Sequence, residues 1–171
     1  PRGKVLGGSS SINAMVYVRG HAEDYNAWNA VAPGWGWDEV APVFHRMEDW
    51  DGPVSAVRGT EGPLRVHDVS AEVHPITRTY LQAAQQAGFK INSDYNGADM
   101  EGAALYQITT KNGLRASTSR AYLRPAKKRQ NLSIQTKAHV TRILFDAKRA
   151  TGVDYVQNGK SKTAKARAEI I

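Results

Sequence analysis

Residues 1–20 read PRGKVLGGSSSINAMVYVRG, and this stretch decides the fold more than any other part of the chain. Its glycine pair, Gly7-Gly8, lets a backbone approach a ligand closely because no Cβ stands in the way. The serines at positions 9–11 are typical of a helix start, where free N–H groups attract anions such as phosphate. Two interpretations stay open from the spacing: a glycine turn before a capped helix, which spacing alone favours, or a phosphate-binding loop.

Composition places the chain among ordinary globular proteins. The length of 171 residues is enough for one domain, or parts of two, with a substantial core. Hydrophobic residues make up 41% and charged residues 23%, as is usual for a globular protein. No apolar run approaches the length of about 20 residues that a membrane span needs. The sequence has no cysteine, which excludes disulfides and thiolate metal sites and fits a reducing compartment. We therefore expect a cytoplasmic location, and association with a membrane stays open.

The net charge of +7 is unevenly distributed along the chain. Residues 1–110 carry 8 Lys or Arg and 13 Asp or Glu, whereas residues 111–171 carry 15 and 3. A basic half is found in nucleic-acid-binding proteins, but here the aromatic residues do not alternate with the charges as a stacking platform requires. A solvated surface, or a face that meets an acidic part of the same protein, is the favoured interpretation, and nucleic acid is an unlikely partner. The alternative function is a non-catalytic binding module whose basic C-terminal half engages an anionic partner.

Local patterns predict a mixed α and β chain with helices early and antiparallel strands late. The predicted helices cover residues 21–32, 37–47, 75–87 and 117–123. Pro42 is compatible with the second of them only in its first turn, and Pro125 is expected to end the last. The predicted strands cover residues 64–67, 104–110, 132–135, 140–145, 153–156 and 164–170, with a hairpin turn at Asn158-Gly159.

The first twenty residues resemble the first signature of the glucose–methanol–choline (GMC) oxidoreductases, flavoenzymes that oxidise alcohols. Further motifs follow in the family's order, and the resemblance therefore spans essentially the whole chain, nearest to the choline dehydrogenase and bacterial alcohol dehydrogenase branch. These motifs are Arg19-Gly20-His21, Trp35-Gly36-Trp37, Gly62-Pro63-Leu64, Asn96-Gly97, Tyr106-Gln107, Gly113 to Thr118, Ala121-Tyr122-Leu123, Asn131-Leu132 and His139-Val140.

The resemblance implies a fold of the α+β or mixed α/β class, containing part of an FAD-binding dinucleotide domain and part of a substrate cap with an antiparallel sheet. Residues 1–47 would form an FAD-binding segment with the glycine–serine loop, residues 48–130 a substrate-cap segment, and residues 131–171 strands that return to the FAD-binding domain. The implied activity is FAD-dependent oxidation of a primary alcohol, choline-like or other, to an aldehyde by hydride transfer to the flavin.

The resemblance also implies which residues contact FAD. They are Val5, Gly7, Gly8, Ser9, Ser10, Asn13, Ala14, Met15 and, through its backbone at the adenine, Val140. Some relatives attach the flavin covalently to a histidine at the position of Ile12, whose aliphatic side chain has no nucleophilic nitrogen. We therefore expect non-covalent FAD.

Two features of the family are missing from the sequence. It has no GxGxxG strand–turn–helix motif, and no histidine beyond His139 matches the family's C-terminal catalytic base. We therefore expect an internal fragment with no catalytic residue of its own. On its own it would be inactive and would bind FAD weakly. The expected partners are an alcohol substrate and the remaining N- and C-terminal parts of the enzyme.

A metal site is not expected. The five histidines are scattered without ligand spacing, and Asp49 and Asp51 lie in a turn-like stretch without an evident acid–base partner. Trp50, Tyr95 and Tyr106 are candidates for a substrate pocket, although a place in the core is favoured for them. The sequence does not identify the alcohol, the electron acceptor or the oligomeric state.

Overall fold

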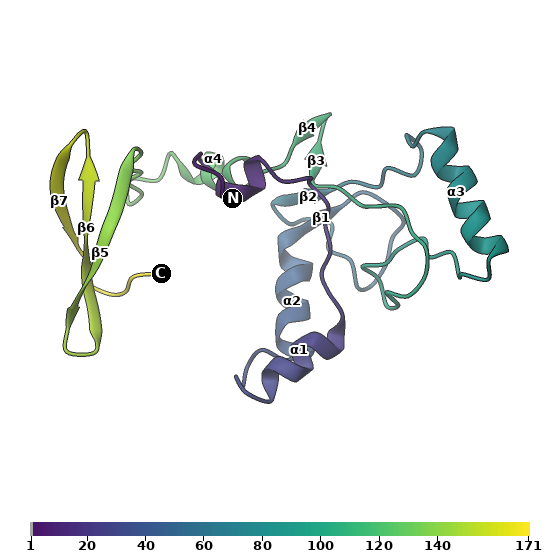
Figure 1. The fold of residues 1–171 in the computed structure, drawn as a ribbon, viewed down its shortest axis with the longest axis horizontal. Helices are drawn as coiled ribbons and strands as arrows, with labels where there is room; N and C mark the ends of the chain where they lie inside the picture. Colours follow the sequence, from purple (N-terminus) through teal and green to yellow (C-terminus); the bar gives the residue numbers. More distant parts are fainter. Residues whose placement is uncertain (1) are drawn as a thin grey trace. The chain divides into compact units, whose positions relative to one another are not determined.

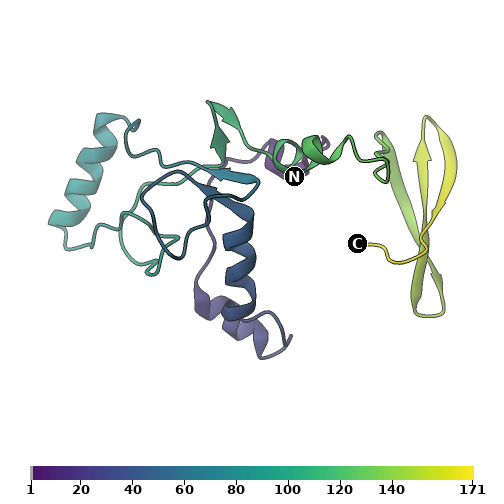
Figure 2. The ribbon, with the colours of Figure 1, turned by 180° about the vertical axis from the view of Figure 1, so that it is seen from behind.

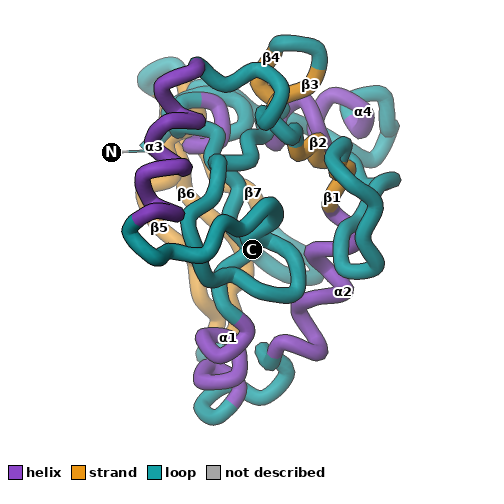
Figure 3. The backbone as a smooth tube through the Cα atoms, turned by 90° about the vertical axis from the view of Figure 1, so that its right-hand side faces the viewer, coloured by secondary structure: helices purple, strands orange, loops and turns teal. Residues whose placement is uncertain are grey.

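A computed structural model describes residues 2–171, which fall into two compact units that divide between Lys127 and Lys128. The elements of unit 1 are drawn in Figures 1 and 2. They are η1 (Gly8–Ser11), α1 (Ala22–Asn29), α2 (Trp37–Met47), β1 (Glu48–Trp50), β2 (Leu64–Val66), α3 (Pro75–Gln86), β3 (Thr110–Lys111), β4 (Leu114–Arg115), η2 (Ser119–Leu123) and α4 (Arg124–Ala126). A long loop joins β1 to β2, whereas a tight turn joins β3 to β4 (Figure 3).

The core of unit 1 lies at the parallel pair of β1 and β2. Tyr17, Trp50 and Val66 form its buried cluster, with Leu64 packed against them. Of the three aromatic residues considered for a substrate pocket, Trp50 and Tyr95 are buried, as favoured, whereas Tyr106 is 67% exposed. Many other large hydrophobic side chains of residues 2–171 are also exposed, so the chain leaves much apolar surface uncovered.

The helix predicted over residues 37–47 is confirmed at the same bounds as α2. Asp38 and Glu39 lie in its first turn, where the helix dipole favours negative charge. Its aromatic face meets α1, where the Tyr25 ring lies 5.5 Å from Trp37 and 5.9 Å from Phe44, centroid to centroid. The expectation that Pro42 lies in the first turn is wrong, because it lies inside the helix. Helix formation there tolerates one missing N–H donor because the other turns and the aromatic packing remain.

The helix that begins at Pro75 is confirmed as α3. Pro75 is its first residue, and the His74 ring accepts the Ile76 N–H at 3.3 Å as a cap. Gly88 follows the helix with φ +91°, as a helix-ending glycine does. The first predicted helix is also confirmed, but it is shorter than residues 21–32 and comprises Ala22–Asn29.

Unit 2 contains one antiparallel sheet in the order β5–β6–β7, with β5 (Ala138–Asp146), β6 (Arg149–Gln157) and β7 (Lys160–Lys165). The hairpin turn at Asn158-Gly159 is confirmed. No strand forms at residues 132–135, and the last strand ends at Lys165 instead of running to residue 170. β7 pairs with β6 as far as Gly152, and beyond it the Ala166 N–H donates to the Thr151 carbonyl at 2.8 Å before the Arg149 side chain takes over the Arg167 and Ala168 carbonyls.

Two predictions between residues 104 and 123 need correction. The strand over residues 104–110 is reduced to β3 and isolated bridges from Ile108 to Val16 and to His67, because side chains occupy part of the ladder there. The helix predicted over residues 117–123 begins at Ser119 with π geometry and continues without a break into α4, which contains Pro125. The expectation that Pro125 ends the helix is wrong by one residue, because α4 runs to Ala126.

No helix in the described part of the chain combines the length and the apolarity needed to cross a bilayer.

Candidate functional site

The glycine–serine segment, residues 5–15, opens with a tight turn made by two glycines in left-handed conformations. Gly7 has φ +92° and Gly8 has φ +55°, and the Gly8 N–H donates to the Val5 carbonyl at 2.8 Å. A Cβ built on Gly7 would lie 2.4 Å from the Ser11 Oγ, whereas a Cβ on Gly8 would meet open space. Gly7 is therefore required by the packing of the chain itself, and Gly8 presents a bare backbone to its surroundings.

The three serines do not cap a helix, contrary to the expectation from sequence. η1 is a short 3-10 turn that begins before them, and no side chain caps it. The Ser10 Oγ donates to the Gly7 carbonyl at 2.6 Å, and the Ser11 Oγ donates to the Leu6 carbonyl at 2.9 Å. The left-handed turn brings these carbonyls within reach of the hydroxyls. The first backbone N–H groups of a helical turn have no acceptor within the turn, and this also applies to η1.

A second segment of the chain holds the glycine–serine segment in place. The Thr118 N–H donates to the Ser10 Oγ at 3.0 Å, and the Thr118 Oγ1 donates to the Gly7 carbonyl at 3.2 Å. The Arg115 Nη1 donates to the Asn13 Oδ1 at 2.8 Å. Sequence reasoning did not include Arg115 and Thr118 among the site residues, although both lie in the Gly113 to Thr118 motif, which was the available signal.

Asn13, Ala14 and Met15 end the segment with their backbone locked and their side chains at the surface. The Met15 N–H donates to the Asn13 Oδ1 at 3.0 Å, and Met15 has the unusual φ of +65° for a residue other than glycine. Asn13 and Ala14 are exposed. Because the Asn13 Oδ1 accepts from both Met15 and Arg115, its Nδ2 group is the donor that remains for another partner.

The predicted site residues are divided between the two units. Val5 to Met15 belong to unit 1, whereas Val140 belongs to β5 of unit 2, opposite Tyr155 and 52% exposed. β5 is an edge strand of its sheet, so it leaves backbone groups on one side without a partner in that sheet.

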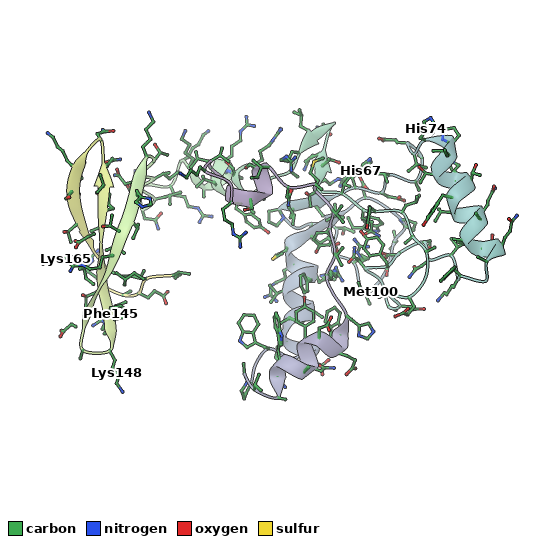
Figure 4. The ribbon with its side chains drawn as sticks, viewed as in Figure 1. His67, His74, Met100, Phe145, Lys148 and Lys165 are labelled. Carbon is green, nitrogen blue, oxygen red and sulfur yellow. The ribbon has the colours of Figure 1, made fainter. Side chains whose placement is uncertain are left out.

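A charged cluster lies where β1 and β2 end. The His67 Nδ1 lies 2.6 Å from the Asp51 Oδ2, the His67 Nε2 lies 3.2 Å from the Glu72 Oε1, and Arg65 bonds Asp51 at 2.9 Å. These residues line an open cavity of about 580 Å³ beside the β3–β4 turn, and Figure 4 labels His67 there. Asp49 lies in β1 and not in a turn as expected, and the parallel register sets it opposite Arg65.

Hydrogen bonds shift the proton affinities of this cluster. The hydrogen bond with Asp51 raises the pKa of His67 above its ordinary 6.5, against the opposing effect of burial. Burial by itself would raise the pKa of Asp51, but hydrogen bonds from the Asp68 N–H and from His67, with the charge of Arg65, bring it below its ordinary value. The two pKa shifts therefore favour the state in which His67 is protonated and Asp51 is ionised.

A buried ionic cluster fixes the chain just beyond the glycine–serine segment. Glu48 is fully buried between Arg19, which bonds its Oε2, and Arg58, whose Nη2 lies 2.5 Å from its Oε1. The Arg58 Nη1 reaches the Asp94 Oδ1 at 2.5 Å, and the Arg58 guanidinium lies 4.0 Å from the centroid of the Trp50 ring. This cluster holds segments of unit 1 together.

The remaining histidines do not assemble a metal centre. His21 and His45 both line a second open cavity, of about 510 Å³. Across residues 2–171, however, no three His, Asp or Glu side chains converge as a metal ion requires.

Comparisons with known proteins agree on one family. A family model described as GMC oxidoreductase matches residues 1–171. The chain is 46% identical to an oxygen-dependent choline dehydrogenase of Rhizobium rhizogenes over 100% of its own length and 31% of that protein. It is 44% identical to an alcohol dehydrogenase [acceptor] of Pseudomonas putida over 96% of its length and 30% of that protein. The chain thus spans about a third of the length of these relatives.

Solved structures show the same fold. Pyridoxine 4-oxidase from Mesorbium loti matches with a TM-score of 0.90 and 31% identity, over 96% of this chain and 33% of that one. An FAD-dependent oxidoreductase from Chaetomium thermophilum matches with a TM-score of 0.89 and 27% identity, over 97% of this chain and 31% of that one.

Proposed function

This chain belongs to the GMC oxidoreductase family, and on that premise we propose that the protein containing it oxidises a primary alcohol, choline-like or other, to an aldehyde with FAD. When bound, FAD accepts the hydride that leaves the alcohol carbon. Support comes from the choline and alcohol dehydrogenases to which the chain is similar, and from the FAD-dependent oxidoreductase that shares its fold.

The bare backbone at Gly8 is the observation that carries the proposal. A Cβ there would meet no atom of the described residues within 4 Å, so packing among these residues does not require that position to be empty. We propose that this space receives the FAD pyrophosphate and that Gly7 and Gly8 allow its approach. The Ser9 and Ser10 amides would donate to the phosphate oxygens, since η1 supplies no acceptor for its first turn. Val5, whose carbonyl closes the turn, would border the same site.

We propose that the C-terminal end of the glycine–serine segment lies next to the isoalloxazine ring of FAD. Asn13, Ala14 and Met15 would border the isoalloxazine, with the Asn13 Nδ2 as a hydrogen-bond donor. Arg115 supports this role because it holds the Asn13 Oδ1 and so orients the amide. In the second unit, the backbone of Val140 would contact the adenine.

FAD would be bound non-covalently, since the exposed Ile12 has no atom that can form a bond to the flavin. No residue of this chain is assigned to proton abstraction from the alcohol. Residues 1–47 would serve the FAD-binding domain, residues 48–130 the substrate cap, and residues 131–171 the strands that return to the FAD-binding domain. The other parts of the protein would cover the exposed apolar surface and supply the catalytic base.

The full-length protein tests the proposal directly. We expect a flavin absorbance spectrum in the purified protein and bleaching of that spectrum under anaerobic conditions by choline or another primary alcohol. Acid precipitation should release the flavin into the supernatant. A full-length protein that neither retains added FAD nor is reduced by any primary alcohol would overturn the assignment, and flavin that stays in the acid pellet would overturn non-covalent binding. The proposal includes a cytoplasmic location, which cell fractionation tests.

The alternative of a binding module for an anionic polymer finds less support. Residues 128–171 contain ten Lys or Arg and three Asp or Glu. However, Lys162 and Lys165 project from opposite faces of β7 by strand alternation, and Lys162 bonds the Gln157 Oε1 at 2.9 Å. Arg142 is likewise paired with Asp154 at 2.8 Å. These three cations lie on both faces of the sheet, and Lys162 and Arg142 are engaged within it.

A further inference from the structure

The segment that leaves Met15 pairs with the segment that ends at Thr109, but the ladder between them is incomplete. The Thr109 N–H donates to the Met15 carbonyl at 2.8 Å, and the Tyr17 N–H donates to the Gln107 carbonyl at 2.9 Å. In a regular antiparallel pair the Gln107 N–H would return a hydrogen bond to the Tyr17 carbonyl. Here the Gln107 N–H bonds elsewhere.

The Tyr95 hydroxyl occupies the place of the missing bond. It accepts the Gln107 N–H at 3.0 Å and donates to the Tyr17 carbonyl at 2.7 Å. Tyr95 is 9% exposed, and burial raises the pKa of its hydroxyl, so the proton needed for donation is retained. A side chain thus bridges the two segments, and without its hydroxyl the buried Gln107 N–H would have no acceptor.

The Asn96 amide extends the same replacement by one step. Its Nδ2 donates to the Tyr17 carbonyl at 3.0 Å and to the Gln107 Oε1 at 2.8 Å, while its Oδ1 accepts the Arg19 N–H at 2.8 Å. Asn96 is 4% exposed. It therefore presents to the strand the donor and the acceptor that a neighbouring strand residue would present.

We propose that Tyr95 and Asn96 are positioning residues for the flavin-binding segment. They fix Tyr17, which lies two residues beyond Met15, and the Met15 N–H is in turn held by the Asn13 Oδ1 at 3.0 Å. Loosening Tyr17 would shift Met15 and Asn13 relative to the flavin ring. This inference rests on the proposed function.

The test uses the full-length protein with FAD and three variants: Tyr95→Phe, Asn96→Ala and the control Asn92→Ala. Asn92 resembles Asn96 in chemistry, but its Nδ2 bonds the Asp99 and Glu101 carbonyls at 2.7 and 3.1 Å and its Oδ1 accepts the Asp94 N–H at 2.8 Å, so among the described residues it bonds neither Tyr17 nor Gln107. We expect Tyr95→Phe and Asn96→Ala to raise the FAD dissociation constant about five- to tenfold, as loss of one or two buried hydrogen bonds predicts. They should also shift the flavin absorbance maxima and the flavin reduction potential. Asn92→Ala should lower the melting temperature without these flavin effects.

Tyr95→Phe keeps the ring and removes a single oxygen, so it tests the inference even if Asn96→Ala does not fold. Unchanged flavin spectra, potential and affinity in Tyr95→Phe would overturn the inference. Equal flavin effects in Asn92→Ala would also overturn it, because they would show a general loss of stability. A wild-type protein that does not bind FAD would overturn both this inference and the proposed function, whereas failure of the variants alone would leave the proposed function standing.

Discussion

The Ser10 Oγ accepts a hydrogen bond from the Thr118 N–H at 3.0 Å, across 108 positions of sequence. The same hydroxyl donates to the Gly7 carbonyl, so one serine side chain joins the glycine turn to the start of η2. The geometry of the glycine–serine segment therefore depends on its hydrogen bonds with Thr118, a residue far away in the sequence. The predictions for FAD binding follow from this connection.

Ser10→Ala should weaken FAD binding in the full-length protein. The change removes the acceptor of the exposed Thr118 N–H and should cost about 0.5–1.5 kcal/mol, so the FAD dissociation constant should rise about two- to tenfold. Quenching of flavin fluorescence on titration with FAD measures this. Ser11→Ala is the matched control, because the Ser11 Oγ bonds only the nearby Leu6 carbonyl among the described residues. An effect of Ser11→Ala as large as that of Ser10→Ala would contradict the role given to the long-range bond.

Gly8→Ala and Gly88→Ala form a pair that separates backbone strain from ligand exclusion. Both glycines have positive φ, +55° and +91°, and a Cβ at either would meet open space. Each substitution should cost about 1–2 kcal/mol of unfolding free energy, measured by urea denaturation. Only Gly8→Ala should reduce the amount of FAD bound, because its methyl group would enter the proposed pyrophosphate site. Equal FAD content in the two purified variants would argue against that site.

Local periodicity and end signals made α2 and α3 predictable from the sequence. The apolar face of α2 recurs with helical spacing, and Pro75 marks the start of α3. The strand expected over residues 104–110 failed for a non-local reason. Its ladder bonds are replaced by side chains of Tyr95 and Asn96, and no local propensity encodes that replacement.

The sequence motif indicates which residues to consider for the candidate site, but it does not indicate their contacts. The glycine pair and its neighbours follow from the motif, but the sequence suggested serine caps where the hydroxyls bind carbonyls behind them. Partners such as Arg115 could not be assigned, because nothing in a single sequence shows which of its basic residues meets Asn13. The partners of Asp51 could not be predicted either, because they depend on the pairing of β1 with β2.

His67 should make stability depend on pH near neutrality. Its pKa is raised in the folded protein, so its contribution is fully present below about 6.5 and is lost as pH rises through the higher folded value. The pKa of Asp51 is lowered, so the contribution of Asp51 is present above its ordinary value and lost in acid. We expect the melting temperature to fall as pH rises above about 6.5, and this fall to be smaller in His67→Gln. Scanning fluorimetry across pH, with His45→Gln as the control, measures it. A His67→Gln profile identical to wild type would contradict the role of the pair.

Glu48→Gln should be among the most destabilising single changes in unit 1. Glu48 is fully buried and faces two guanidinium groups, and its Oε2 also accepts the Gly59 N–H at 3.1 Å. The substitution keeps the shape but leaves Arg19 and Arg58 buried without their shared counter-ion. Removing one partner of such a cluster costs about 3–5 kcal/mol, because the remaining charges are poorly solvated. Urea denaturation of the full-length protein, followed by circular dichroism, measures this loss.

Asp99→Asn is the matched control for Glu48→Gln, because it removes a carboxylate from an exposed pair. Asp99 bonds Lys90 at the surface, where water already solvates both charges, so its loss should leave the denaturation midpoint nearly unchanged. The contrast between the two variants isolates the effect of burial from the effect of removing a negative charge. A Glu48→Gln protein as stable as Asp99→Asn would mean that Arg19 and Arg58 find other solvation when Glu48 is neutral. In that case the cluster would not be what fixes the chain beyond the glycine–serine segment.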